Sequence, residues 1–154
     1  MSGALGTTIR AARRADAAGI ARLLDQLGYP QAGLTATADR VESWSQDPAR
    51  AAFVAEADDQ LLGVIAVLVC PFFERTATWC RIVALVVAAT ARGRGVGSAL
   101  VAAAEAFAET QGCLRLEVTS AVGRRDAHAF YRARGYVDQG GVSLRFLRDL
   151  ATGQ

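Results

Sequence analysis

The sequence predicts an α/β protein in which a mixed sheet is flanked by helices, and three observations support this class. The chain has 154 residues, a single-domain length with room for a core. Hydrophobic residues make up 52% of it, which argues against disorder. A strand-like hairpin is followed by stretches in the order βαβα, an order typical of mixed sheets with helices on their faces.

The first third of the chain is expected to contain one strand and two helices. Thr8–Ala12 forms the opening strand. Asp16 is positioned to cap a helix over Ala17–Leu27, in which isoleucine and leucine recur at helical spacing. A second helix is expected over Thr37–Gln46. It ends before Pro48, because proline disfavours helical backbone at the residue that precedes it.

The middle of the chain is expected to form a hairpin and a long central strand. Ala51–Ala57 and Leu61–Cys70 are apolar stretches on either side of Asp58-Asp59-Gln60, whose residue types are typical of a tight turn. Thr78–Val87 is a longer apolar stretch and is predicted to be a buried strand.

The last third begins with an alanine-rich helix over Ser98–Thr110. A strand-like alternation over Leu114–Thr119 follows, and then a short helix that carries Tyr131. Val142–Arg148 alternates apolar and polar residues and is predicted to be a final edge strand.

A glycine-rich turn joins the long strand to the alanine-rich helix. It reads Arg92-Gly93-Arg94-Gly95-Val96-Gly97. Glycines let the backbone approach an anion closely, and the N-terminus of the following helix adds partial positive charge. The two arginines add full charges. The turn therefore predicts a site for a phosphorylated cofactor.

Two familiar phosphate motifs fit this turn poorly. A Walker loop requires lysine followed by Ser or Thr, but the chain has no lysine and Ser98 follows Gly97 directly. A dinucleotide fingerprint would use Gly93 and Gly95 but finds Ser98 at its third glycine, with Glu117 as the distant acid inside the next strand. A dinucleotide enzyme stays an alternative, and binding of NADH at the turn would test it.

The remaining pattern is R-x-x-G-x-G, formed by Arg92, Gly95 and Gly97. It resembles the acyl-CoA loop of the GNAT-type N-acetyltransferases. Downstream, the chain is similar to the segment N-x-x-A-x-x-F-Y-x-x-x-G-[YF] of the same family. The matching residues are Ala127, Phe130, Tyr131, Gly135 and Tyr136, whereas Arg124 stands where many members have Asn.

The resemblance implies a single GNAT-like domain over residues 1–154, with a mostly antiparallel sheet of about six or seven strands and about four helices. It implies acetyl-CoA as the cofactor. The loop would hold its pyrophosphate, and the end of the preceding strand would pair with its pantetheine arm. The residues expected to bind it are Leu85, Val86, Val87, Arg92, Gly93, Arg94, Gly95, Val96, Gly97, Ser98, Arg124, Ala127, His128 and Tyr131.

Tyr131 is the predicted catalytic acid. A tyrosine hydroxyl has an ordinary pKa of about 10, so at neutral pH it retains the proton that a leaving thiolate needs. On its helix it shares a face with Arg124 and His128, and the neighbouring Phe130 is expected in the core.

The general base is less clearly marked. Many family members have a Glu on the central strand, but Ile82–Leu85 holds no acid. Glu117 on the next strand and Glu74 in the loop before Thr78 are the candidates, with Asp126 or a chain of waters as alternatives. Glu117 is expected instead to pair with Arg115 or Arg81.

These residues predict an enzyme that moves an acetyl group from acetyl-CoA to a primary amine of a small molecule by direct attack. The alternatives are a non-catalytic domain that senses acyl-CoA and, as a substrate variant, an aminoglycoside acetyltransferase. A homodimer is common in the family and is expected here.

Other classes are disfavoured by composition. The arginines are dispersed, unlike those of a nucleic-acid surface. The longest apolar run, Leu61–Phe73, is too short to span a membrane, and the N-terminus does not read as a signal peptide. Cys70, Cys80 and Cys113 lack the spacing of metal ligands, so we expect reduced thiols, no metal and a cytoplasmic protein.

Overall fold

The computed structural model describes residues 6–151. Contacts within the chain group it into two compact units, Met1–Thr119 and Ser120–Gln154.

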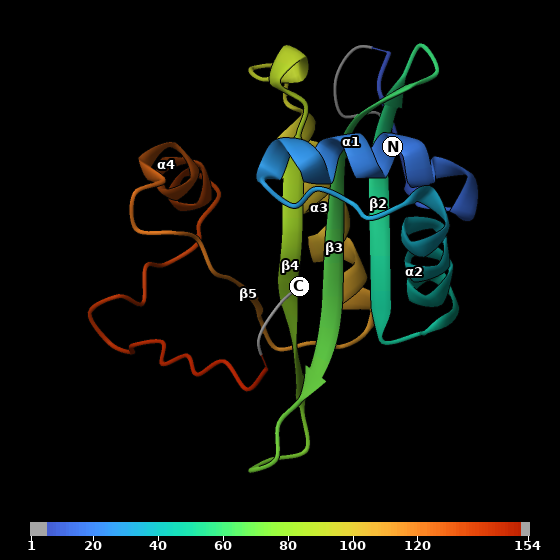
Figure 1. The fold of residues 1–154 in the computed structure, drawn as a ribbon. Helices are drawn as coiled ribbons and strands as arrows, with labels where there is room; N and C mark the ends of the chain where they lie inside the picture. The colour runs from blue at the N-terminus through green and yellow to red at the C-terminus, as the bar shows by residue number, and fades with distance from the viewer. Residues whose placement is uncertain (1–5, 152–154) are drawn as a thin grey trace. The chain divides into compact units, whose positions relative to one another are not determined.

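The first unit is built on a single five-stranded sheet with the strands in chain order (Figure 1). Neighbouring strands from β1 to β4 are antiparallel, whereas β5 runs parallel to β4. The sheet is therefore mixed and mostly antiparallel, as predicted, with fewer strands than the six or seven expected. The strands are β1 (Thr8–Ala11), β2 (Arg50–Ala57), β3 (Gln60–Pro71), β4 (Thr78–Val87) and β5 (Leu116–Val118).

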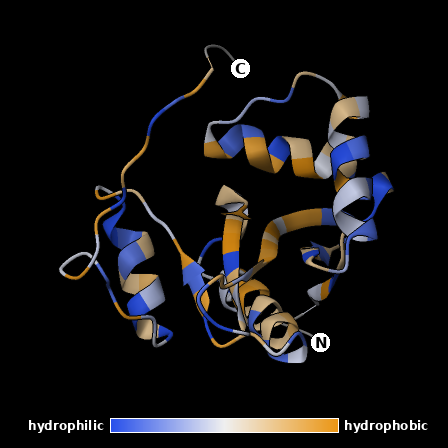
Figure 2. Ribbon diagram, turned by 90° about the horizontal axis from the view of Figure 1, so that it is seen from below, coloured by the Kyte–Doolittle hydropathy of each residue, from blue (hydrophilic) through white to orange (hydrophobic). Residues whose placement is uncertain are grey.

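Helices cover both faces of this sheet. α1 (Ala17–Leu27) and α2 (Leu34–Gln46) lie on one face, and α3 (Val96–Thr110) lies on the other (Figure 1). Short 3₁₀ turns, η1 (Arg14–Asp16) and η2 (Ala89–Ala91), precede α1 and follow β4. Figure 2 shows hydrophobic residues concentrated on the strands and on the helix faces that meet them. A core cluster joins α1 and α2 to the sheet, with Ala12, Ile20, Leu23, Val41, Val54, Val64 and Val86 as its buried members.

The β2–β3 hairpin closes through two residues. Asp58 and Asp59 have φ of +52° and +61°, and Ala57 pairs with Gln60 across the turn. Two successive left-handed residues match the right-handed twist of the flanking strands, and aspartate tolerates this conformation better than most residues. The predicted turn is confirmed.

Asp16 lies at the predicted N-cap position of α1 but makes no side-chain cap there. Its two carboxylate oxygens instead accept from both terminal nitrogens of Arg10, each at 2.8 Å, and one also accepts from the backbone N–H of Arg13 at 2.9 Å. Arg10 further donates from Nε to Glu56 on β2. The buried carboxylate thus ties η1 to the edge of the sheet.

Replacing this carboxylate should lower stability in a pH-dependent way. Burial raises the pKa of Asp16, but the hydrogen bonds from Arg10 and Arg13 outweigh it and hold the pKa below its ordinary value. Asp16 therefore stabilises the fold above its unfolded pKa of about 4, and this contribution is lost as pH falls through the depressed folded pKa. We expect Asp16→Asn to cost about 3 kcal/mol in urea unfolding at pH 7, and the difference from wild type to shrink below pH 4.

The matched control is Asp39→Asn. Asp39 also pairs with an arginine, Arg14, but the pair is exposed: the side chain of Asp39 is 64% exposed and that of Arg14 is 46% exposed. Such pairs contribute roughly 1 kcal/mol or less. An equal loss in the two variants would show that the burial of Asp16 adds nothing.

The second unit contains one helix, α4 (Arg125–Ala133), within its described residues. The predicted final strand over Val142–Arg148 is wrong, because the structure shows no regular element there. The side chains of Val142, Leu144 and Phe146 are 76–89% exposed. Alternation marks a segment that could bury one face in a sheet, but a strand forms only where a neighbouring strand accepts its hydrogen bonds.

Candidate functional site

The glycine-rich turn joins η2 to α3. Gly93 and Gly95 have φ of +79° and +78°, a left-handed backbone that a side chain disfavours. Gly95 is the N-cap of α3, which begins at Val96 rather than at the predicted Ser98. Gly97 therefore belongs to the first turn of the helix rather than to the loop.

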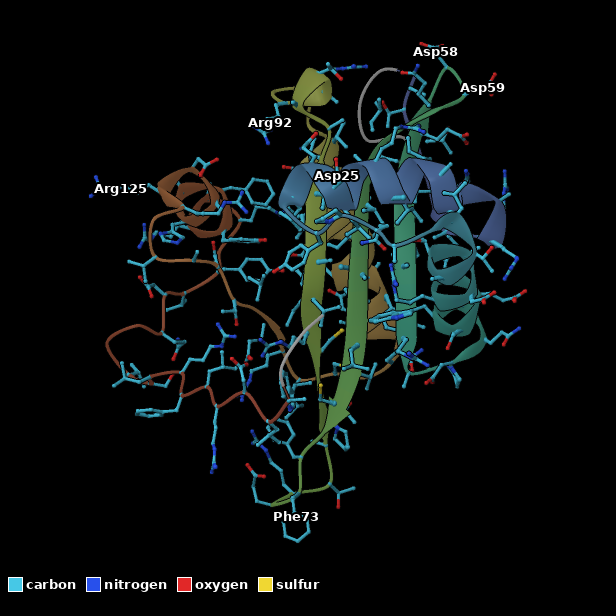
Figure 3. The ribbon with its side chains drawn as sticks, viewed as in Figure 1. Asp25, Asp58, Asp59, Phe73, Arg92 and Arg125 are labelled. Carbon is cyan, nitrogen blue, oxygen red and sulfur yellow. The ribbon has the colours of Figure 1, made fainter. Side chains whose placement is uncertain are left out.

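The start of α3 offers several backbone N–H groups. Ala99 N–H donates to Gly95 O at 3.1 Å, the first bond of the helical ladder. The N–H groups of Val96, Gly97 and Ser98 precede it and have no carbonyl to reach within the helix. Arg92 and Arg94 in the preceding turn are exposed, and Figure 3 shows Arg92 at the same end of the sheet. The arrangement suits an anion.

β4 presents an open edge next to this turn. β5 pairs with β4 at Cys80, Arg81 and Ile82, so β4 after Ile82 has no neighbour in the sheet on that side among the described residues. Ala88 N–H donates to Leu62 O of β3 at 2.7 Å. Because backbone groups alternate in direction along a strand, those of Val87 and Leu85 point away from β3.

This alternation separates the three residues predicted to pair with a pantetheine arm. Leu85 and Val87 present their main-chain groups to the open edge. Val86 turns its main chain toward Val64 of β3, and its side chain lies in the core. Two of the three predicted residues are thus suitably oriented for a ligand at this edge.

A β-bulge lies where the pairing with β5 stops. Ala66 pairs with Ala84 and Val67 with Ile82, which leaves Val83 as the extra residue of β4. Its side chain is 45% exposed. A bulge turns backbone groups out of the regular ladder, and bulges occur often beside active sites.

Gln26 is a residue of this region that sequence analysis missed. It lies near the end of α1, yet its Nε2 donates to Val87 O at 2.9 Å and its Oε1 accepts from Ala89 N–H at 3.0 Å. No pattern in the sequence signals this contact, because an exposed glutamine on a helix has no motif and its partners lie in a distant segment.

Glu117 is engaged by Arg81, one of the two partners expected for it. Arg81 Nη1 donates to Glu117 Oε1 at 3.0 Å, and Nη2 donates to Thr119 Oγ1 at 2.9 Å. Arg115 instead lies over the ring of Phe72, 5.3 Å from its centroid. Acting as a base would require Glu117 to share or leave its contact with the guanidinium.

The structure does not bring Glu74 to the glycine turn. Glu74 is exposed in the β3–β4 hairpin loop, before Thr78 at the start of β4, whereas the glycine turn follows the other end of that strand. At a rise of about 3.3 Å per residue, the two ends of β4 are roughly 30 Å apart. The role of Glu74 stays a prediction without support from its position.

In the second unit, the ring of Tyr131 packs between two aromatic neighbours. Its centroid is 5.2 Å from that of Phe130 and 5.6 Å from that of Tyr136. Phe130 is half-buried rather than in the core as expected. Burial raises the pKa of Tyr131 and the charge of Arg124 opposes this, so the net pKa lies above its ordinary value. The hydroxyl is held in its neutral, donating form.

The end of α4 explains part of the downstream motif. Gly135 has φ of +89°, its N–H donates to Arg132 O, and Tyr136 N–H donates to Tyr131 O, both at 3.0 Å. This is a Schellman stop, in which glycine supplies the left-handed residue and a hydrophobic pair closes the end. Gly135 and Tyr136 thus have a structural reason to follow Tyr131 at this spacing.

The other predicted residues of the second unit lie on or beside α4. Arg124 is exposed at the N-cap, Ala127 is half-buried, and His128 Nε2 lies 2.8 Å from Ala121 O. The contact holds His128 to the turn before the helix. Which of these residues bind a cofactor remains a prediction.

Burial disfavours the reactive thiolate form at two of the cysteines. Burial raises the pKa of the Cys80 thiol to about 11, and burial also raises that of Cys70. Within residues 6–151, no cluster of three or more His, Cys, Asp or Glu side chains is arranged to hold a metal ion. Across the same range, no helix has the length and apolar character needed to cross a membrane.

A family model and solved structures relate this chain to known proteins. A model of the "Acetyltransferase (GNAT) family" matches residues 20–136. A search of curated protein sequences found no match. Solved structures match over most of the chain. A transcriptional regulator from Bacillus halodurans C-125 superposes with a TM-score of 0.81 at 22% identity, covering 93% of this chain and 98% of that one.

Two further solved structures are similar over nearly their whole length. Glucosamine-6-phosphate N-acetyltransferase from Arabidopsis thaliana has a TM-score of 0.81 at 20% identity, covering 94% of this chain and 99% of that chain. AAC(6')-Iy in complex with the bisubstrate analogue CoA-S-monomethyl-acetylneamine has a TM-score of 0.80 at 20% identity, with the same coverage. At these identities the likeness establishes the shared fold.

Proposed function

Because the chain belongs to the GNAT family of acetyltransferases, we propose that it transfers an acetyl group from acetyl-CoA to a primary amine of a small molecule. The observation that carries this proposal is that a left-handed glycine turn at the start of α3 lies beside the open edge of β4. One suits the phosphates of coenzyme A, and the other suits its amide-containing arm.

The residues present fit the cofactor. The N–H groups of Val96, Gly97 and Ser98 would bind the pyrophosphate, with Arg92 and Arg94 adding charge. The main chains of Leu85 and Val87 would pair with the arm. When bound, acetyl-CoA supplies a thioester whose carbonyl carbon the amine attacks directly.

Two groups of the chain would assist this transfer. An N–H of the open edge, at Leu85, is suited to donate to the thioester oxygen as negative charge develops there. The hydroxyl of Tyr131, whose pKa is raised by burial, would protonate the leaving thiolate. Arg124, Ala127 and His128 are proposed to line the cofactor from α4.

The amine must also lose a proton. With an ordinary pKa of about 10.4, about one alkyl amine in a thousand is neutral at pH 7. Glu117, on the strand beside β4, is proposed to accept this proton, although Arg81 donates a hydrogen bond to it. Glu74 lies at the far end of β4. A chain of waters is the alternative route for the proton.

The acceptor class is proposed from the similar structures. The similar structures include a glucosamine-6-phosphate N-acetyltransferase and the aminoglycoside N-acetyltransferase AAC(6')-Iy, which supports a small amine as acceptor and an aminoglycoside as its variant. We further propose that both units belong to one domain, because the family model matches residues 20–136 and so extends into both. A homodimer and a cytoplasmic location complete the proposal.

The proposed function is tested by calorimetric titration with acetyl-CoA, with NADH as the control ligand. We expect acetyl-CoA to bind with a Kd of about micromolar order and NADH not to displace it. Release of CoA thiol with a panel of small amines then identifies the acceptor. A protein that binds no acetyl-CoA, or that exchanges it for NADH, would refute the assignment.

Two observations favour a second candidate, a domain that senses acyl-CoA without turnover. β4 carries no acid from Ile82 to Val87, and Glu117 is held by Arg81. A sensor would bind acetyl-CoA tightly, release no thiol with any amine, and respond to Tyr131→Phe with no change in binding.

A further inference from the structure

The carboxamide of Gln26 fills part of the open edge of β4. Its Nε2 donates to Val87 O at 2.9 Å, and its Oε1 accepts from Ala89 N–H at 3.0 Å. Both contacts are of ordinary hydrogen-bond length. A single side-chain amide thus satisfies the donor and the acceptor that a neighbouring strand would otherwise bind.

The two bridged groups lie on the side of the chain away from β3. Ala88, which lies between them, donates to Leu62 O of β3. Val87 and Ala89 therefore turn their groups the other way, toward the side where β5 pairs no further than Ile82. Any ligand whose amide groups run along this edge as far as Val87 meets Gln26 there.

We propose that Gln26 is a positioning residue that competes with the amide arm of the cofactor for the end of β4. This inference rests on the proposed function, in which that arm pairs with Leu85 and Val87. Without cofactor, Gln26 satisfies the edge and makes it a poorer template for another chain. Cofactor binding exchanges the side-chain amide for the amide of the arm, and the exposed Gln26 side chain turns into water.

The competition predicts that removing the carboxamide tightens binding, an effect that a purely structural role would not produce. Gln26→Met keeps the length and helix propensity of the side chain but has no donor or oxygen acceptor. We expect the variant to bind CoA about three- to tenfold more tightly than wild type, because two hydrogen bonds no longer need to be broken.

One control tests whether the effect is specific to position 26, and another tests whether it acts through the amide arm of CoA. Gln111→Met makes the same change at an exposed glutamine, the C-cap of α3, and should leave CoA affinity unchanged. Titration with 3′-phospho-ADP, which has the phosphates of CoA but not its arm, should give the same affinity in all three proteins. Thermal unfolding of each protein verifies that the fold is retained.

Each outcome decides the matter. Equal or weaker CoA binding by Gln26→Met, with normal binding by wild type, would overturn this inference and leave the proposed function standing. An equal gain for CoA and 3′-phospho-ADP would also overturn it, because the effect would not act through the arm. Failure of all three proteins to bind CoA would overturn both proposals.

Discussion

Gly95→Asp is expected to weaken acetyl-CoA binding by at least about 100-fold. Gly95 is the N-cap of α3, at the point where the N–H groups of the first helical turn are exposed to a ligand. A carboxylate there would occupy the space of the pyrophosphate and repel its charge. Calorimetric titration of the variant with acetyl-CoA measures the loss.

Two matched variants separate charge from backbone strain. Aspartate tolerates positive φ in this chain, since Asp58 and Asp59 adopt +52° and +61°. Gly112→Asp places the same residue at φ of +74°, after α3 rather than before it, and should bind as wild type. Gly95→Asn adds a side chain of similar size without charge and should lose less affinity. Full binding by Gly95→Asp would contradict the role of the loop.

Tyr131→Phe is expected to lower kcat by about 100-fold with little change in the KM for acetyl-CoA. The substitution removes the proposed proton donor and keeps the ring that packs on Phe130 and Tyr136. The loss should therefore fall on the chemical step rather than on binding. Steady-state rates of thiol release with a saturating amine give both constants.

The matched control is Tyr136→Phe, which removes a hydroxyl from the adjoining ring of the same helix stop and should leave kcat near that of wild type. Because burial raises the pKa of Tyr131 above its ordinary value of about 10, its hydroxyl stays protonated through pH 9. We thus expect no loss of kcat between pH 7 and pH 9 from ionisation of this group. An unchanged kcat in Tyr131→Phe would remove it from the acid role.

Local patterns in the sequence were sufficient for the order of the elements and for the glycine turn. The period of the apolar residues distinguishes helix from strand, and tight turns require residue types such as the aspartates of the β2–β3 hairpin. The same local reasoning placed the start of α3 two residues late, at Ser98 rather than Val96, and failed for Val142–Arg148. Alternation there has no partner strand in the described part of the second unit.

The tertiary structure decided which polar groups meet. The bond from Arg81 to Glu117 joins two strands that become neighbours only when β5 pairs with β4. Asp16 was expected to cap a helix, but its carboxylate instead forms a salt bridge with Arg10 of β1. Gln26 reaches Val87 and Ala89 from another element altogether.

The sequence by itself thus determined the family and the order of strands and helices, because both are marked by patterns of residues near one another along the chain. The open edge of β4, the bulge at Val83 and the bridge made by Gln26 depend on how far β5 pairs and on where α1 ends over the sheet. Such features are set by packing between distant segments, and no local pattern of side chains encodes them.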